Sequence, residues 1–89
     1  MNLNDVIFID RFPKLDLHGY DRETARVAIQ DFIRDQRTLK QPIIVIIHGI
    51  GYGILRSTTN EVLRSHKMVI DYKSFYYNHG CTIVQIKID

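Results

Sequence analysis

Five consecutive β-branched apolar residues at positions 43–47, with the sequence IIVII, form the longest uninterrupted apolar run of the chain. Proline precedes this run, and the glycine-rich segment HGIGYG follows it at positions 48–53. A short run of Ile and Val with such flanks predicts a strand that is buried on both faces. We therefore expect the sheet to be built around residues 43–47.

Two longer segments repeat their apolar residues every three or four positions, which is the spacing of an amphipathic helix. The first helix is predicted over residues 22–39, directly after Asp21, a suitable N-cap. The second follows the glycine-rich segment and ends near His66, for which we expect only a structural role. Each helix should pack one face on the sheet. The apolar positions are Ala25, Ala28, Ile29, Phe32 and Ile33 in the first helix and Leu55, Thr59, Val62 and Leu63 in the second.

Residues 14–18 alternate between polar and apolar side chains, which predicts a half-buried strand. Leu15 and Leu17 would share one face of this strand. Asp16 and His18 would share the other face with Cα atoms about 6.5–7 Å apart, so that a carboxylate and an imidazole lean the same way.

Two further strands are predicted at residues 68–73 and 81–88. Because only the short loop at residues 75–80 separates them, they should pair antiparallel. Residues 6–9 predict either a short edge strand or a clasp on the outside of the domain, before Pro13 ends the segment.

The predicted order is β-α-β-α-β-β, an α/β arrangement, and 89 residues are enough for one two-layer core. We expect residues 1–13 to be an N-terminal extension and residues 14–89 to be the domain. A right-handed crossover would make the first two strands parallel, so their carboxyl ends would lie at one edge of the sheet. Ligands of α/β folds usually bind at that edge.

The composition is that of a globular domain, with 45% hydrophobic and 25% charged residues. The first residues lack the basic start of a signal peptide, and no apolar run is long enough to span a bilayer, so we expect a cytoplasmic protein without membrane contact. The single cysteine, Cys81, has no disulfide partner within the chain and should be a small apolar strand residue. A net charge of +2 allows nucleic-acid binding only through a local site.

Three of the four histidines, His18, His48 and His79, should meet at this edge, with Asp16 beside them. A zinc site is disfavoured because the chain has no pair of cysteines or closely spaced histidines. Two-metal phosphodiester chemistry is disfavoured too, because it usually needs several carboxylates. An imidazole oriented by a carboxylate fits better, since His18 could exchange a proton with an oxygen at a scissile phosphate. RNA would be the easier substrate because its 2′-OH is an internal nucleophile.

The glycine-rich segment leads into a helix N-terminus, where free N–H groups and the helix dipole favour an anion such as phosphate. Taken alone, a Gly-x-Gly turn is a weak signal, and the segment lacks the lysine of a nucleotide-binding loop. Tyr76 and Tyr77, in the loop before the last strand, could stack on bases or simply pack.

Four motifs in this order and spacing resemble the small MutS-related (Smr) domain family. They are LDLHG at residues 15–19, HGIG at residues 48–51, GILR at residues 53–56 and GCTIV at residues 80–84. The resemblance covers residues 14–88, which is nearly the whole chain.

The resemblance implies an α+β two-layer βαβαββ fold similar to the C-terminal domain of bacterial translation initiation factor three, with a mixed four-stranded sheet. It also implies nucleic-acid binding and endonuclease activity on DNA or RNA, including messenger RNA on stalled ribosomes. The family's nuclease motif is matched by Asp16 and His18, which are the expected catalytic residues. The residues expected to bind nucleic acid are Lys14, His48, Gly49, Ile50, Gly51, Arg56 and His79.

Two departures from the family pattern stand out. Tyr77 and Asn78 occupy places where the family often has two glycines, and the chain has no room for the larger protein that often carries this domain. We therefore expect a stand-alone domain or one separated from a parent protein. The expected partners are nucleic acid and, as a candidate, the ribosome.

The family resemblance leaves the metal requirement open: no metal ligands are assigned, and Mg²⁺ or Mn²⁺ is a candidate cofactor. One alternative function is a non-catalytic module that binds nucleic acid or the ribosome and recruits another factor. Another is dimerisation through residues 6–9, although we expect a monomer.

Overall fold

The protein is described by a computed structural model over residues 3–51 and 53–88. Residues 1–2, 52 and 89, which belong to the expected extension, glycine-rich segment and domain end, lie outside the described residues. The element order after a short N-terminal 3₁₀ turn is the predicted β-α-β-α-β-β. The elements are η1 (Leu3–Asp5), β1 (Lys14–Asp16), α1 (Arg22–Thr38), β2 (Ile43–Ile47), α2 (Ile54–Ser65), β3 (Val69–Phe75) and β4 (Asn78–Ile86).

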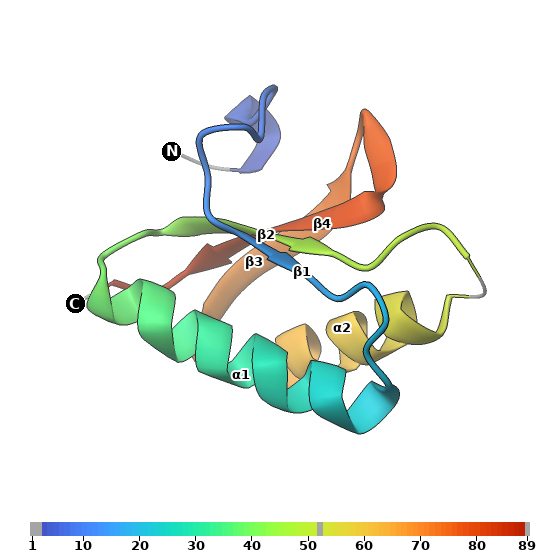
Figure 1. Ribbon diagram of the computed structural model, residues 1–89. Helices are drawn as coiled ribbons and strands as arrows, with labels where there is room; N and C mark the ends of the chain where they lie inside the picture. The colour runs from blue at the N-terminus through green and yellow to red at the C-terminus, as the bar shows by residue number, and fades with distance from the viewer. Residues whose placement is uncertain (1–2, 52, 89) are drawn as a thin grey trace.

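The four strands form one mixed sheet in the order β1-β2-β4-β3, with both helices on one face (Figure 1). β1 and β2 are parallel, and β4 runs antiparallel to both β2 and β3, as expected. Ile47 lies opposite Asp16 on one side and opposite Cys81 on the other. The ends of β1 and β2 therefore lie beside the beginning of β4, at the edge where the sequence places the candidate site.

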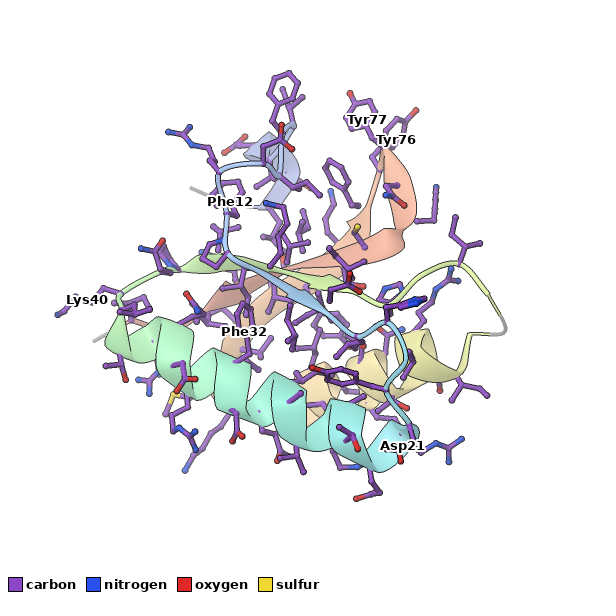
Figure 2. The ribbon with its side chains drawn as sticks, viewed as in Figure 1. Phe12, Asp21, Phe32, Lys40, Tyr76 and Tyr77 are labelled. Atoms are coloured by element: carbon purple, nitrogen blue, oxygen red, sulfur yellow. The ribbon has the colours of Figure 1, made fainter. Side chains whose placement is uncertain are left out.

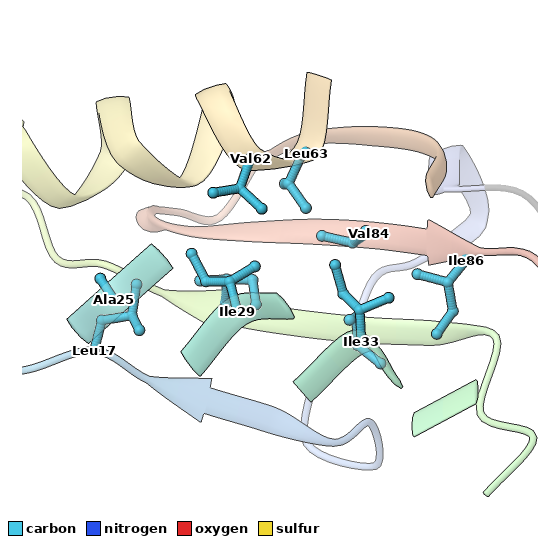
Figure 3. Packing of buried hydrophobic residues seen from close by; sticks show 10 residues of the cluster. Leu17, Ala25, Ile29, Ile33, Val62, Leu63, Val84 and Ile86 are labelled. Atoms are coloured by element: carbon cyan, nitrogen blue, oxygen red, sulfur yellow. The ribbon is translucent and has the colours of Figure 1, made fainter. Parts of the chain in front are cut away.

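The main core fills the space between the helices and the sheet (Figure 3). Residues Ala25, Ile29 and Ile33 of α1 are fully buried there, which confirms the predicted apolar stripe. The helix begins where expected, because the Asp21 carboxylate accepts a hydrogen bond of 2.8 Å from the Thr24 N–H. Truncating a buried isoleucine of this cluster to alanine would typically cost about 2–5 kcal/mol.

The N-terminal segment covers the opposite face of the sheet (Figure 1). Leu3 and Val6 are buried against a second cluster that includes Val45 and Ile83. Residues 6–9 form no strand, so the edge-strand alternative is wrong and the clasp is observed. The reason is geometric: turns within the segment fold it over the sheet face. Val6 and Ile9 pack on that face, while Ile7 and Phe8 stay exposed.

The β3–β4 connection is tighter than the predicted loop at residues 75–80. β3 extends to Phe75, β4 begins at Asn78, and only Tyr76 and Tyr77 form the turn. A bulge after Val69 interrupts the pairing of β3 with β4, and Ile70 is 59% exposed. In the described part of the chain, no helix has the length and apolar character needed to cross a bilayer.

Candidate active site

A tight turn follows β1 and presents His18. The Leu17 N–H still donates to the Ile47 carbonyl at 2.9 Å, which anchors this strand end to β2. The Tyr20 N–H then donates to the Leu17 carbonyl at 3.0 Å, so His18 and Gly19 are the central residues of a β-turn. Gly19 has a φ of 81°, a value that L side chains rarely adopt. The turn places His18 in solvent at the edge of the sheet.

The Asp16 carboxylate holds the backbone of this turn. Its Oδ1 accepts a hydrogen bond of 2.9 Å from the His18 N–H. The strand geometry expected from the sequence does not continue this far, because β1 ends at Asp16 and His18 already belongs to the turn. The carboxylate therefore orients the backbone that carries His18, and among the described residues the imidazole makes no hydrogen bond.

Cys81 lies on β4, with Ile47 of β2 between it and Asp16. It is buried, as the sequence predicts. Burial raises the pKa of the Cys81 thiol, and the negative charge of Asp16 raises it further. The thiol therefore stays protonated at neutral pH, which favours a packing role over a nucleophilic one.

The glycine-rich loop after β2 is pinned to the start of β4. The N–H groups of His48 and Gly49 both donate to the Gly80 carbonyl, at 2.9 and 3.0 Å. The backbones pack so closely that a Cβ added to Gly80 would lie 3.3 Å from the Gly49 Cα. This contact brings the glycine-rich segment at residues 48–53 together with the end of the predicted loop at residues 75–80. It also explains why glycine suits position 80.

The His48 ring is used inside the protein. Its Nδ1 donates to the Gly49 carbonyl at 3.0 Å, since a carbonyl can only accept, and its Nε2 then accepts from the Thr82 hydroxyl at 2.8 Å. Burial lowers the pKa of His48; the bond to the Gly49 carbonyl opposes this effect, and the charge of Arg56 adds to it. Both ring nitrogens are therefore engaged inside the protein, and in this structure the ring holds the loop. The expected contact of His48 with nucleic acid stays a prediction.

Thr82 is a site residue that sequence reasoning missed. It is buried, 34 positions away from His48 in the sequence, and in a strand that is otherwise apolar from Cys81 to Val84. A hydroxyl in a buried strand needs a hydrogen-bond partner. That requirement was the available signal, although it could not have named the partner.

The N-terminus of α2 faces this loop without a cap. Gly53 is the N-cap residue, makes no side-chain hydrogen bond, and no acidic residue follows in the first turn. In α1, by contrast, Asp21 caps the helix and Glu23 lies in the first turn. The free N–H groups and the positive end of the α2 dipole therefore remain available to an anion.

Arg56 lies in this first turn and adds a positive charge. Its guanidinium donates to the His79 carbonyl at 3.3 Å, which ties α2 to the start of β4. The His79 side chain is exposed, as are Ile50 and Gly51 of the glycine-rich loop. The expected binding residues of the glycine-rich loop and of the start of β4 thus line one surface, where backbone amides and the Arg56 guanidinium could contact an anion.

Lys14 holds the N-terminal segment. Its ammonium donates to the carbonyls of Asp10 and Phe12, both at 3.0 Å. It lies at the start of β1, two positions before Asp16. Because both of its acceptors are neutral, its positive charge is not cancelled by these contacts.

Two arginines of the helices form ion pairs: Arg26 with Glu23 and Glu61, and Arg34 with Asp31 and Asp35. None of these four pairs involves Lys14 or Arg56. Over residues 3–51 and 53–88, no group of three His, Cys, Asp or Glu side chains could hold a metal ion.

The fold and this arrangement of loops are those of the Smr domain family, and the chain belongs to it: the family model matches residues 15–87. The endonuclease MutS2 of Geobacillus sp. (strain WCH70) is 36% identical over 80 residues, which cover 83% of this chain and 10% of that protein. The endonuclease MutS2 of Clostridium botulinum (strain Eklund 17B / Type B) is 34% identical over 77 residues, again 83% of this chain and 10% of the relative. The chain thus spans about a tenth of the length of these relatives.

Two solved structures have the same fold. The Smr domain of Thermus thermophilus MutS2 matches with a TM-score of 0.82 and 27% identity, over 84% of this chain and 98% of that one. YdaL, a stand-alone small MutS-related protein from Escherichia coli, matches with a TM-score of 0.77 and 22% identity, over 88% and 69% of the two chains. The second match is a likeness of fold alone.

Proposed function

We propose that this Smr domain is a cytoplasmic endonuclease that cuts RNA in preference to DNA, with His18 as its general acid–base group. The observation that carries the proposal is the exposed imidazole of His18, which has no partner among the described residues and stands on a fixed turn at the edge shared with the glycine-rich loop. The endonuclease name of the MutS2 relatives supports the same activity.

Substrate phosphate would be bound by the backbone amides of residues 50–51 and the first turn of α2. Arg56 would add its charge, and the exposed side chain of His79 would contact the neighbouring nucleotide. Gly49 uses its own N–H internally, so the amides of Ile50, Gly51 and the helix start remain as donors. This surface would position the sugar-phosphate backbone of the substrate, and His18 would exchange the proton.

In RNA, the 2′ oxygen would attack the adjacent phosphorus. A bond forms between phosphorus and the 2′ oxygen, and the bond from phosphorus to the 5′ oxygen of the next nucleotide breaks. His18 would accept the 2′ proton or donate one to the leaving 5′ oxygen, with water exchanging the other proton. The expected products are a 2′,3′-cyclic phosphate and a 5′-hydroxyl. Asp16 is the positioning residue, since it holds the turn that carries the imidazole.

The test combines cleavage and binding. His18→Ala should lower the cleavage rate of end-labelled single-stranded RNA about 10²–10⁴-fold, the usual contribution of general acid–base catalysis. Its affinity for a 2′-O-methyl RNA, which lacks the nucleophile, should not change. Gln41→Ala, an exposed residue away from the site, is the matched control. Asp16→Asn keeps an oxygen that can accept the His18 N–H, so it should retain the fold and lose part of the rate.

Full cleavage by His18→Ala would reject the catalytic assignment. Continued cutting of a substrate with deoxyribose at the scissile position would require water as the nucleophile and would reject the 2′-OH mechanism. Assays with Mg²⁺, with Mn²⁺ and with EDTA measure the metal requirement, and chemical identification of the new ends separates the two nucleophiles.

A second candidate is a non-catalytic module that binds nucleic acid or the ribosome and recruits another factor. It is favoured by one observation: the Asp16 carboxylate contacts the backbone of His18 and not its ring. This candidate predicts binding without products under every metal condition. It also predicts that Arg56→Ala weakens binding and lowers the slope of log K against log salt by about 0.7 for a single strand.

A further inference from the structure

The tip of the β3–β4 hairpin carries two exposed aromatic rings. Tyr76 is 78% exposed and Tyr77 is 67% exposed, and Figure 2 shows both at the end of the hairpin, away from the helices. Their ring centroids lie 5.0 Å apart at an interplanar angle of 78°, and Tyr77 also meets Phe75 edge-on at 5.7 Å. These contacts fix the rings relative to one another while most of their surface faces solvent.

The N-terminal segment extends this aromatic surface. Phe8 is 75% exposed and lines a groove of about 400 Å³ together with Ile7, Phe75 and Tyr77. A second groove of about 370 Å³ also has Tyr77 in its wall, and Lys73 lines it. Tyr77 therefore stands between two shallow grooves, one apolar and one containing a cation.

One cation and one carboxylate line the two grooves, on different sides of Tyr77. The Lys73 ammonium donates to the neutral amide oxygen of Asn4 at 2.9 Å, so its charge is not cancelled by this bond. On the apolar side, Asp10 is the acidic residue that lines the groove. The cation thus lies on one side of Tyr77, where a phosphate could pass while a base meets the ring.

The hairpin connects these rings directly to the proposed phosphate site. Only Asn78 and His79 separate Tyr77 from Gly80, whose carbonyl anchors the glycine-rich loop. Three residues of extended strand cover about 10 Å. That length corresponds to about three stacked nucleotides at 3.4 Å each.

We propose that Tyr76, Tyr77 and Phe8 are a stacking surface for unpaired bases, which makes single-stranded nucleic acid the substrate class of this domain. The inference rests on the proposed function in taking its ligand to be the nucleic acid held at the glycine-rich loop. Every base has a π-face, so such stacking tolerates any sequence, whereas bases already paired in a duplex offer no free face. A strand gripped by Arg56 and the loop amides would lay its neighbouring bases along the hairpin.

The decisive measurement is binding, not cleavage. Fluorescence anisotropy with a single-stranded 2′-O-methyl RNA separates affinity from chemistry. Tyr77→Leu keeps an apolar side chain and removes the π-face, and should weaken binding about 5- to 150-fold, the range for the loss of one stacked base. Tyr77→Phe should bind like the original protein. Ile70→Ala, which removes exposed apolar surface at the far end of β3, is the control.

Two further measurements distinguish base stacking from nonspecific binding. The slope of log K against log salt should be unchanged in Tyr77→Leu and should fall by about 0.7 in Lys73→Gln. The chain has no tryptophan, so Tyr77→Trp introduces a single indole whose emission should be quenched by single-stranded but not by duplex RNA.

The outcomes separate the two proposals. If the original protein binds the RNA and the leucine variants of Tyr76, Tyr77 and Phe8 bind it equally well, the stacking surface is rejected and the proposed function stands. If the original protein binds no nucleic acid, the proposed function itself fails. If the leucine variants instead abolish a concentration-dependent dimer seen by light scattering and leave RNA affinity unchanged, the surface joins two copies of the chain and the inference is overturned.

Discussion

Replacing Thr82 by valine tests whether a buried hydrogen bond holds the candidate phosphate loop. The two side chains have nearly the same shape, so the change removes the hydroxyl with little change in volume. Thr82 is only 3% exposed, so it has almost no surface for a ligand to touch. Any effect of Thr82→Val on nucleic-acid binding must therefore pass through His48.

The magnitude follows from the lost donor. In the structure, Nε2 of His48 lies 2.8 Å from the Thr82 Oγ1. Without the hydroxyl, this nitrogen becomes a largely buried acceptor without a partner. Leaving such a group unsatisfied costs about 1–3 kcal/mol of the free energy of unfolding. A chain of this size loses roughly 4–8 °C in Tm for each kcal/mol, so a readily measured shift is expected. The domain should stay folded, because small domains typically have about 5–15 kcal/mol of stability.

The assay is thermal unfolding together with RNA affinity for Thr82→Val, His48→Phe and the double variant. Thr82→Val leaves Nε2 of His48 without its donor, and His48→Phe leaves the Thr82 hydroxyl without its acceptor and the Gly49 carbonyl without its donor. The double change replaces both ends of the His48–Thr82 bond by apolar groups. The double variant should therefore be less destabilised than the sum of the singles, with a coupling of about 0.5–3 kcal/mol. RNA affinity should fall in all three, since each frees the loop that begins at Gly49. Additive effects on Tm, or a Thr82→Val protein with unchanged Tm and affinity, would refute the assigned role of this bond.

The remaining predictions concern pH, packing and capping. The pKa values of His48 and His66 are lowered, chiefly by burial and, for His66, also by the nearby Arg37 and Lys67. The unfolded chain thus binds protons first as pH falls through about 6.5, so denaturant titrations should show stability declining below that pH and levelling off once the folded protein is protonated too; a flat profile between pH 7 and 5 would contradict this. Gly80→Ala should weaken RNA binding, because the added Cβ would lie 3.3 Å from the Gly49 backbone and displace the glycine-rich loop. Its effect on Tm should be small. An RNA affinity equal to that of the original protein would show that the loop adapts without cost. Asp21→Ala should lower the free energy of unfolding by about 0.5–2 kcal/mol, while Asp21→Ser should restore most of it; if serine does not, the cap is not the cause.

Much of the fold could be predicted because its signals are local. The cap at Asp21, the apolar stripe of α1 and the buried run of β2 are each contained in fewer than 20 consecutive residues. The parallel pairing of β1 with β2 followed from the handedness of the connection between them. The strand-boundary errors at residues 6–9 and in the β3–β4 turn both arose where contacts with distant parts of the chain decide the conformation.

The candidate site was predicted in outline for the same reason. The motifs place Asp16, His18 and Gly49 at the carboxyl ends of β1 and β2. These two strands are parallel, so their carboxyl ends lie at the same edge of the sheet. The local sequence pattern could not predict which atoms of these residues face the ligand. The Asp16 carboxylate was expected at an imidazole and instead binds a backbone N–H, because the strand ends at Asp16, two residues before His18.

The sequence by itself determined the elements, their order and the family, because periodicity, caps and motif spacing depend on neighbours along the chain. Tertiary structure alone decided the role of each polar group. His48 became an internal support because Thr82 and Gly80, from a distant strand, occupy its ring and its backbone. The N-terminal segment became a cover for the sheet because its apolar side chains found a face there. These roles depend on which groups burial brings together, and that is set by packing in three dimensions.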